Sequence, residues 1–143
     1  MSTHLKDKLE KIEQILAQLT EESAKGKPII VEGRKDADAL KKLGIIGTIL
    51  TAKTGGKSFA EASQEIERFG VKEVILLLDF DRRGKEGTQR LQQDLERMRI
   101  KSDPTFWFKL SRLVGREINC IESLPSYIET TQEKTMRAHS QEV

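Results

Sequence analysis

Leucine and isoleucine recur every three or four positions near the N-terminus, at Leu5, Leu9, Ile12, Leu16 and Leu19. This spacing predicts an amphipathic helix over residues 5–25 with one apolar face. The pattern lasts barely two heptads, so packing against the helix's own domain is favoured over a coiled coil. The same helix is also a candidate surface for self-association.

Short apolar runs alternate with helical patterns through the middle of the chain. The runs cover residues 28–33, 45–52 and 74–78, and the helical patterns that follow them cover residues 37–43, 58–70 and 86–99. Runs of this length, bounded by proline, glycine or charged residues, are typical of buried strands. A short fourth strand is expected at 100–102. The alternation predicts an α/β fold with a compact, open, mainly parallel four-stranded sheet flanked by helices.

These patterns divide the chain into four parts. Residues 1–26 form the N-terminal helix, and residues 27–102 form the α/β domain. Residues 103–129 are expected to be a C-terminal helical extension, because their apolar positions again have helical spacing. Residues 130–143 are polar and show no periodicity, so a disordered tail is expected there.

Composition and charge add few constraints. The chain has 143 residues and a net charge of +2, from 25 basic and 23 acidic residues. Only local clusters could therefore indicate a nucleic-acid partner. The one cysteine, Cys120, allows no intrachain disulfide and is expected to be a small buried hydrophobe in a reducing, cytoplasmic protein. No stretch is apolar for long enough to span a bilayer, so no membrane association is expected.

The segment TAKTGGKS, residues 51–58, lies between a predicted strand and a predicted helix, as a phosphate-binding P-loop would. The P-loop pattern needs a glycine where Thr51 stands, and without it the loop is less able to wrap its amides around a phosphate. A nucleotide hydrolase is therefore the last of the alternatives. The loop is expected instead to border another site and to contact phosphate through Lys53, Gly55, Gly56 and Lys57.

Acidic residues follow two of the predicted strands. Glu32 ends the first strand, and Asp79 and Asp81 follow the third. Ligands of open α/β sheets bind at the carboxyl ends of the strands, so these side chains are expected to converge. Clustered carboxylates repel one another unless a cation lies among them, and oxygen ligands with no adjoining histidine or cysteine suit Mg²⁺ or Mn²⁺. The alternative is that each acid is a solvated strand end or pairs with a neighbouring arginine.

Basic residues follow the same acids directly, at Arg82, Arg83 and Lys85. Positive charge beside a carboxylate cluster would anchor the phosphates of a nucleic acid. The alternative is that these residues serve solubility and local charge balance.

Two motifs carry a family resemblance. VEGRKD at residues 31–36 resembles the V-E-G-x-x-D motif of Toprim domains, and DFDRRG at residues 79–84 resembles their D-x-D-x-x-G motif. The resemblance extends over about residues 27–102, with the motifs in the family's order. Toprim domains occur in topoisomerases, bacterial primases, nucleases and recombination-repair proteins. The whole chain resembles the small, stand-alone archaeal Toprim proteins, which are described as primase-like or nuclease-like.

The resemblance implies a Rossmann-like fold and a role for each acid. Glu32 would act as general acid or base and as a metal ligand, and Asp79 and Asp81 would hold Mg²⁺. These three would be the catalytic residues. Asp36 would support the site from behind the metal ligands.

The resemblance also implies that Gly33 and Gly84 allow tight turns. Arg83 stands where type IA topoisomerases carry a third acid, so the pattern is closer to that of the primases. The implied function is Mg²⁺-dependent, nuclease-like or primase-like phosphoryl transfer on RNA or DNA. A non-catalytic module that binds metal and nucleic acid is the alternative, followed by the P-loop hydrolase.

Overall fold

The computed structural model describes the backbone of residues 2–142 and the side chains of residues 4–138. Strands and helices alternate along the chain, which confirms the predicted α/β class. The elements are α1 (Ser2–Ala24), β1 (Ile29–Val31), α2 (Arg34–Lys42), β2 (Ile49–Thr51), η1 (Thr54–Gly56), α3 (Phe59–Phe69), β3 (Glu73–Leu76), α4 (Arg82–Arg97), β4 (Lys101–Asp103), α5 (Thr105–Val114), η2 (Ile121–Ser123) and α6 (Leu124–Glu142).

The four strands form one sheet in the order β2–β1–β3–β4, and every pair is parallel. Strands β1 and β3 are neighbours at the centre, with Ile30 opposite Leu76 in the register. The residues that follow β1 and β3 therefore leave the sheet side by side. This neighbour relation places Glu32 next to Asp79.

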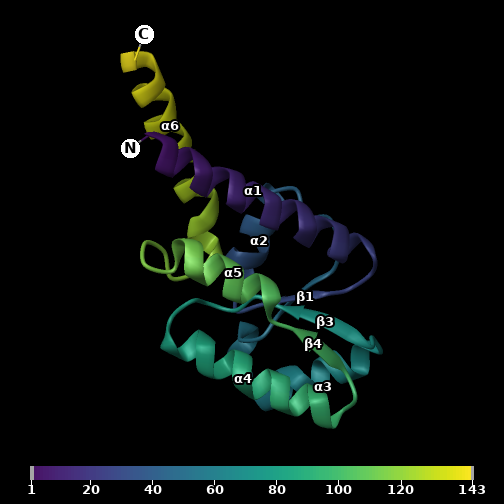
Figure 1. Cartoon of the computed structure of the whole chain (residues 1–143). Helices are drawn as coiled ribbons and strands as arrows, with labels where there is room; N and C mark the ends of the chain where they lie inside the picture. Colours follow the sequence, from purple (N-terminus) through teal and green to yellow (C-terminus); the bar gives the residue numbers. More distant parts are fainter. Residues whose placement is uncertain (1, 143) are drawn as a thin grey trace.

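Alternate residues of the central strands face opposite helical layers. Val31 and Leu77 pack in a cluster with α1, α2 and α5, whereas Ile30 and Leu76 pack in a cluster with α3 and α4. Figure 1 shows these two layers, with α1 and α5 on one side of the strands and α3 and α4 on the other. Because the strands are covered on both faces, their sequences are unbroken apolar runs.

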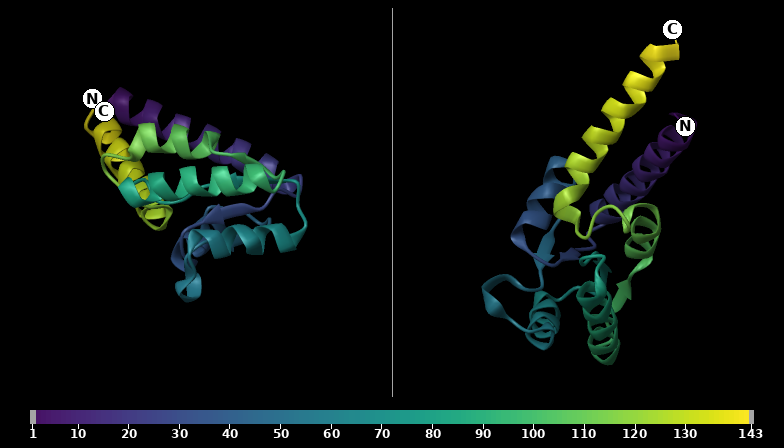
Figure 2. Two further views of the ribbon diagram at one scale, coloured as in Figure 1. Left: turned by 90° about the horizontal axis from the view of Figure 1, so that it is seen from below. Right: turned by 90° about the vertical axis from the view of Figure 1, so that its left-hand side faces the viewer.

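Helix α1 uses its apolar face within the chain. Ile12 and Leu19 are fully buried, and Ile12 packs with Val114 of α5 and Leu124 of α6. Figure 2 shows α6 running alongside α1 at one end of the molecule. The predicted packing of this helix on its own domain is therefore observed. Self-association through α1 stays a prediction.

The C-terminal segment differs from the disordered tail expected at residues 130–143. Helix α6 continues to Glu142, and Val143 lies outside the described residues. Thr131 is buried and its hydroxyl donates to the Tyr127 carbonyl at 2.7 Å, and Arg137 pairs with Glu133 at 3.8 Å. A buried threonine and local polar pairs stabilise this segment, and neither produces an apolar periodicity. The sequence pattern therefore did not indicate a helix here.

Helix α4 begins at Arg82, four residues before the predicted range 86–99. Asp81 caps it, because its Oδ1 accepts a hydrogen bond from the N–H of Gly84 at 2.8 Å. The cap places Arg82, Arg83 and Lys85 in the first turn of a helix. Within residues 2–142, no helix is both long enough and apolar enough to cross a membrane.

The two glycines of the motifs have different structural roles. Gly84 is buried in the first turn of α4, where an added Cβ would lie 1.9 Å from the carbonyl oxygen of Asp79. Gly33 has a φ of −138°, which any residue adopts, and an added Cβ would meet only Asp36 Oδ2 at 3.8 Å. Close backbone approach therefore requires glycine at position 84, whereas neither a turn nor a contact requires it at position 33.

Gly84→Ala is expected to lower the free energy of unfolding by about 1–3 kcal/mol, the range for an overpacked site. The collision with Asp79 outweighs the gain in helix propensity of about 1 kcal/mol. Urea denaturation followed by circular dichroism measures the change. Gln89→Ala, at an exposed position of the same helix, is the control and should be near neutral. Equal unfolding midpoints for the two variants would contradict this account of Gly84.

Candidate metal centre

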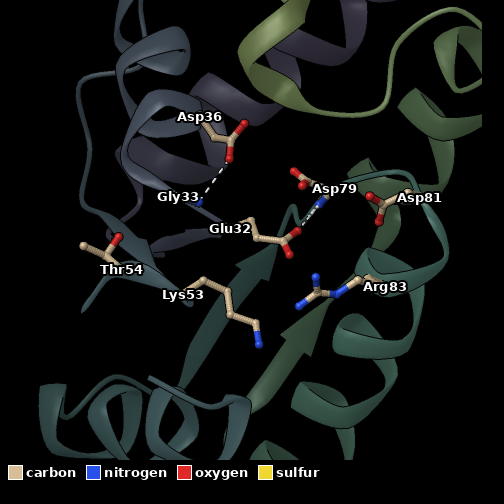
Figure 3. Close-up of a pocket in the computed structure, with 8 residues that line it drawn as sticks. All are labelled: Glu32, Gly33, Asp36, Lys53, Thr54, Asp79, Asp81 and Arg83. Atoms are coloured by element: carbon tan, nitrogen blue, oxygen red, sulfur yellow. Dashed lines mark hydrogen bonds between the residues drawn. The ribbon is translucent and has the colours of Figure 1, made fainter. Parts of the chain in front are cut away.

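A pocket of about 420 Å³ opens at the carboxyl edge of the sheet. Figure 3 shows its side chains, which come from the ends of β1, β2 and β3 and from the starts of α2 and α4. Its lining residues are Glu32, Gly33, Asp36, Lys53, Thr54, Asp79, Asp81 and Arg83. The structure thus brings the three predicted metal ligands into one concave site.

Glu32 and Asp79 are joined directly. The backbone N–H of Asp79 donates to Glu32 Oε2 at 3.1 Å, a contact between residues 47 positions apart. The contact follows from the adjacency of β1 and β3. It fixes one oxygen of Glu32, and no described residue forms a hydrogen bond with the other oxygen.

Asp81 completes the trio from the N-terminus of α4. One of its oxygens, Oδ1, caps the helix through Gly84, which leaves Oδ2 for a ligand. The side chain is exposed, whereas Glu32 and Asp79 are half-buried. The two aspartates do not lie on one extended strand, because β3 ends at Leu76 and Asp81 is a helix cap.

Burial and neighbouring negative charge disfavour the ionised form of Asp79. Its Oδ1 is buried and has no hydrogen-bond partner among the described residues. The pKa of Asp79 is raised from its ordinary 3.8 to about 8. Burial is the largest cause, and the negative charge of Glu32 is the second. A buried carboxylate among like charges needs either a proton or a cation. The donor set is therefore one that fits a divalent cation with oxygen ligands.

Asp36 is buried and supports this edge of the sheet, as the family motif suggests. Its Oδ2 accepts from the N–H of Gly33 at 3.0 Å, and its Oδ1 accepts from the N–H of Glu122 at 2.9 Å. Burial raises its pKa, against the opposing effect of these two hydrogen bonds. The side chain thereby links the loop after β1 to the segment before α6.

The C-terminal extension supplies three contacts that the motifs did not indicate. Trp107 Nε1 donates to the carbonyl oxygen of Asp79 at 3.0 Å, and the N–H of Phe80 donates to the carbonyl oxygen of Asn119 at 2.6 Å. The Sγ of Cys120 and carboxylate oxygens of Asp36 and Asp79 all lie within 4.8 Å of one another. No local pattern announces such contacts, since they depend on where a distant helix returns to the sheet.

Cys120 therefore differs from the buried hydrophobe predicted for it. It is half-buried, its Sγ lies 3.6 Å from Ser123 Oγ, and it is near the carboxylates. No thiol adjoins the acids in the sequence, but the folded chain brings Cys120 close to Asp36 and Asp79.

Two of the predicted basic residues line the pocket. Lys53 and Arg83 extend toward it from opposite sides (Figure 3), and Lys53 Nζ lies 4.0 Å from the centre of the Phe59 ring. Arg82 instead pairs with Glu86 at 3.2 Å. Lys85 is exposed and is not part of the lining. Positive charge is thus present at the pocket, but from fewer residues than predicted.

The TAKTGGKS loop does not have the contacts of a P-loop. Lys57 Nζ pairs with Glu65 at 2.6 Å, and Ser58 Oγ accepts from the N–H of Glu61 at 3.1 Å as the cap of α3. Gly55 and Gly56 have φ values of 79° and 75° in the exposed η1 turn, outside the pocket lining. The lysine and serine that a P-loop would aim at a nucleotide therefore have structural partners.

The raised pKa of Asp79 predicts a falling stability with rising pH in metal-free buffer. Between 3.8 and about 8, the folded chain keeps a proton on Asp79 that the unfolded chain has released. The free energy of unfolding then decreases as pH rises through this range. Urea denaturation of the wild type and Asp79→Asn at several pH values measures the effect.

Asparagine cannot titrate, so Asp79→Asn should show a shallower decrease than the wild type. Asp38→Asn, an exposed acid of α2, is the control and should keep the wild-type slope. Parallel pH profiles for all three chains would show that Asp79 ionises normally.

Comparisons with known proteins agree with this geometry. The family model of the Toprim domain matches residues 26–105. A UPF0292 protein of Methanosarcina acetivorans is 37% identical over 135 residues, covering 94% of this chain and 92% of the relative. A UPF0292 protein of Methanocaldococcus jannaschii is 40% identical over 120 residues, covering 83% of this chain and 91% of the relative.

A solved structure, described as a putative protein from Aquifex aeolicus, superposes with a TM-score of 0.64 at 27% identity. The match covers 78% of this chain and 95% of that one. The fold, the order of the motifs and the archaeal relatives lead to one assignment. The chain belongs to the Toprim domain family.

Proposed function

We propose that the protein is a Mg²⁺-dependent enzyme that acts on nucleic-acid phosphodiesters by nuclease-like or primase-like phosphoryl transfer. The observation that carries the proposal is the convergence of Glu32, Asp79 and Asp81 in one pocket beside two cationic side chains. Three carboxylates without a compensating cation are unfavourable, whereas the same three around a divalent ion are a common phosphoryl-transfer arrangement.

Asp79, Asp81 and Glu32 would hold Mg²⁺, with Mn²⁺ as a substitute, because all three offer oxygen ligands. When bound, such an ion neutralises phosphate charge and lowers the pKa of an attacking water or hydroxyl. Glu32 accepts the Asp79 N–H through Oε2, so Oε1 is the oxygen that can take or return a proton. That position suits a general acid or base.

Lys53 and Arg83 would bind the phosphates that flank the reacting bond. The guanidinium of Arg83 can contact two phosphate oxygens at once, and Lys53 is steadied by the Phe59 ring. Asp36 would position Gly33, and with it the backbone next to Glu32, through its hydrogen bond to the Gly33 N–H.

Turnover assays test the proposal. Purified protein is incubated with end-labelled single- and double-stranded RNA and DNA, and separately with nucleoside triphosphates on a template, in Mg²⁺ or in EDTA. Mg²⁺-dependent product is expected on at least one substrate. Asp79→Ala and Glu32→Ala should each lower its rate by at least about 100-fold, the lower range for loss of an acid–base group.

Asp38→Ala and Glu67→Ala remove exposed acids outside the pocket and should keep the wild-type rate. Metal-dependent binding without product on any substrate would favour the non-catalytic module. Nucleotide hydrolysis that is lost in Lys57→Ala but kept in Asp81→Ala would favour the P-loop alternative.

Two adjacent arginines allow a matched test of phosphate binding. Arg83 lines the pocket, whereas Arg82 pairs with Glu86 away from it. Arg83→Gln is expected to weaken nucleic-acid binding and to lower the slope of log affinity against log salt by about 1, the value for one phosphate contact. Arg82→Gln should leave the slope near that of the wild type. Fluorescence anisotropy at several salt concentrations measures both, and equal slopes would remove Arg83 from the binding surface.

A further inference from the structure

A thiol and a second carboxylate lie close to Asp79, which is one of the three proposed Mg²⁺ ligands. Asp36 comes from α2, Asp79 follows β3, and Cys120 precedes η2, yet one ligand atom from each lies within 4.8 Å of the other two. We propose that Asp36, Asp79 and Cys120 form a second cation position, which takes a softer divalent ion than Mg²⁺, such as Zn²⁺ or Co²⁺.

The three segments are held in place largely by backbone hydrogen bonds, and the Sγ of Cys120 has one weak contact, with Ser123 Oγ at 3.6 Å. Trp107 holds the backbone of Asp79, and the Phe80 N–H holds the carbonyl oxygen of Asn119, next to Cys120. Two backbone N–H groups fix the Asp36 carboxylate, and each of its oxygens can still accept another contact. The ligands are therefore positioned without an ion.

One carboxylate oxygen of Asp79 lacks a partner. Asp79 Oδ1 is fully buried and accepts no hydrogen bond from any described residue. In the described part of the chain, neither Asp79 nor Asp36 forms an ion pair with a lysine or arginine. Figure 3 shows the Asp79 carboxylate on the side of the pocket toward Asp36, away from Lys53 and Arg83. An ion at this position would supply the missing partner.

The donor set decides which ions fit. Mg²⁺ and Mn²⁺ favour oxygen ligands, whereas a thiolate together with carboxylates suits Zn²⁺ and its substitute Co²⁺. Three protein ligands leave at least one coordination position open for water or a phosphate oxygen. Binding requires the thiolate, so the thiol proton is released to solvent as the ion binds.

Asp79 would then belong to both positions, with Glu32 and Asp81 on one side and Asp36 and Cys120 on the other. Two-ion centres that share a carboxylate typically hold their ions about 3.5–4 Å apart. The inference goes beyond the proposed function, because it requires only metal binding and holds whether or not the chain turns over a nucleic acid.

Cobalt provides a direct test, because Co²⁺ bound to a thiolate has a charge-transfer absorption in the near ultraviolet that Co²⁺ bound only to oxygen lacks. The full chain is titrated with Co²⁺ under argon with a phosphine reductant. The band is expected in the wild type and absent in Cys120→Ser, since the chain has one cysteine. Asp36→Asn should weaken Co²⁺ binding by at least about tenfold, whereas Asp81→Asn should keep the band.

A second measurement uses only the wild-type chain and covers the case in which Cys120→Ser does not fold. Co²⁺ should slow alkylation of Cys120 by iodoacetamide, and Mg²⁺ at saturating concentration should not. Co²⁺ that binds without the band, a band that persists in Cys120→Ser, or alkylation at equal rates with and without Co²⁺ would each overturn the inference.

The two proposals fail in different experiments. Mg²⁺-dependent turnover by a wild-type chain that shows no cobalt band would remove the second position and leave the proposed function. A cobalt band in a wild-type chain that turns over no nucleic acid would support the second position and remove the proposed function.

Discussion

The hydrogen bond from the Asp79 N–H to Glu32 is the contact on which the site depends, because it records the parallel pairing of β1 with β3. That pairing brings two carboxylates together at the edge of the sheet, and Asp81 follows as the cap of the next helix. The resulting negative charge is unfavourable in the isolated chain. Its cost is expressed in the raised pKa of Asp79 and in an oxygen that lacks a protein partner.

The fold and the identity of the acids could be predicted because both depend on local sequence. A strand buried on both faces must be apolar throughout, and a motif residue at a strand end must lie at the ligand-binding edge. The direction of the Asp81 side chain could not be predicted in the same way. Its position depends on where α4 begins, and the polar residues around position 82 carry no apolar periodicity to mark that start.

The remaining differences come from contacts and helical structure that the pattern of apolar positions does not show. Lys57 was expected to contact phosphate, but it pairs with Glu65 of α3. Cys120 looked like a core residue, but the return of the chain after α5 brings it to the acids. The end of the last helix looked disordered because its residues are mostly polar, and the apolar residues that pack this helix against α1 precede position 130. Sequence separation hides such contacts, whereas the two motifs are visible within six residues each.

The indole of Trp107 donates its N–H to the carbonyl of Asp79, and it is the only tryptophan of the chain. Indole emission responds to the charge and polarity next to the ring nitrogen. The protein therefore carries an intrinsic optical reporter that is hydrogen-bonded to the residue bearing its central carboxylate. Changes of ionisation or occupancy at this edge of the sheet can be followed in the unlabelled, unmodified chain.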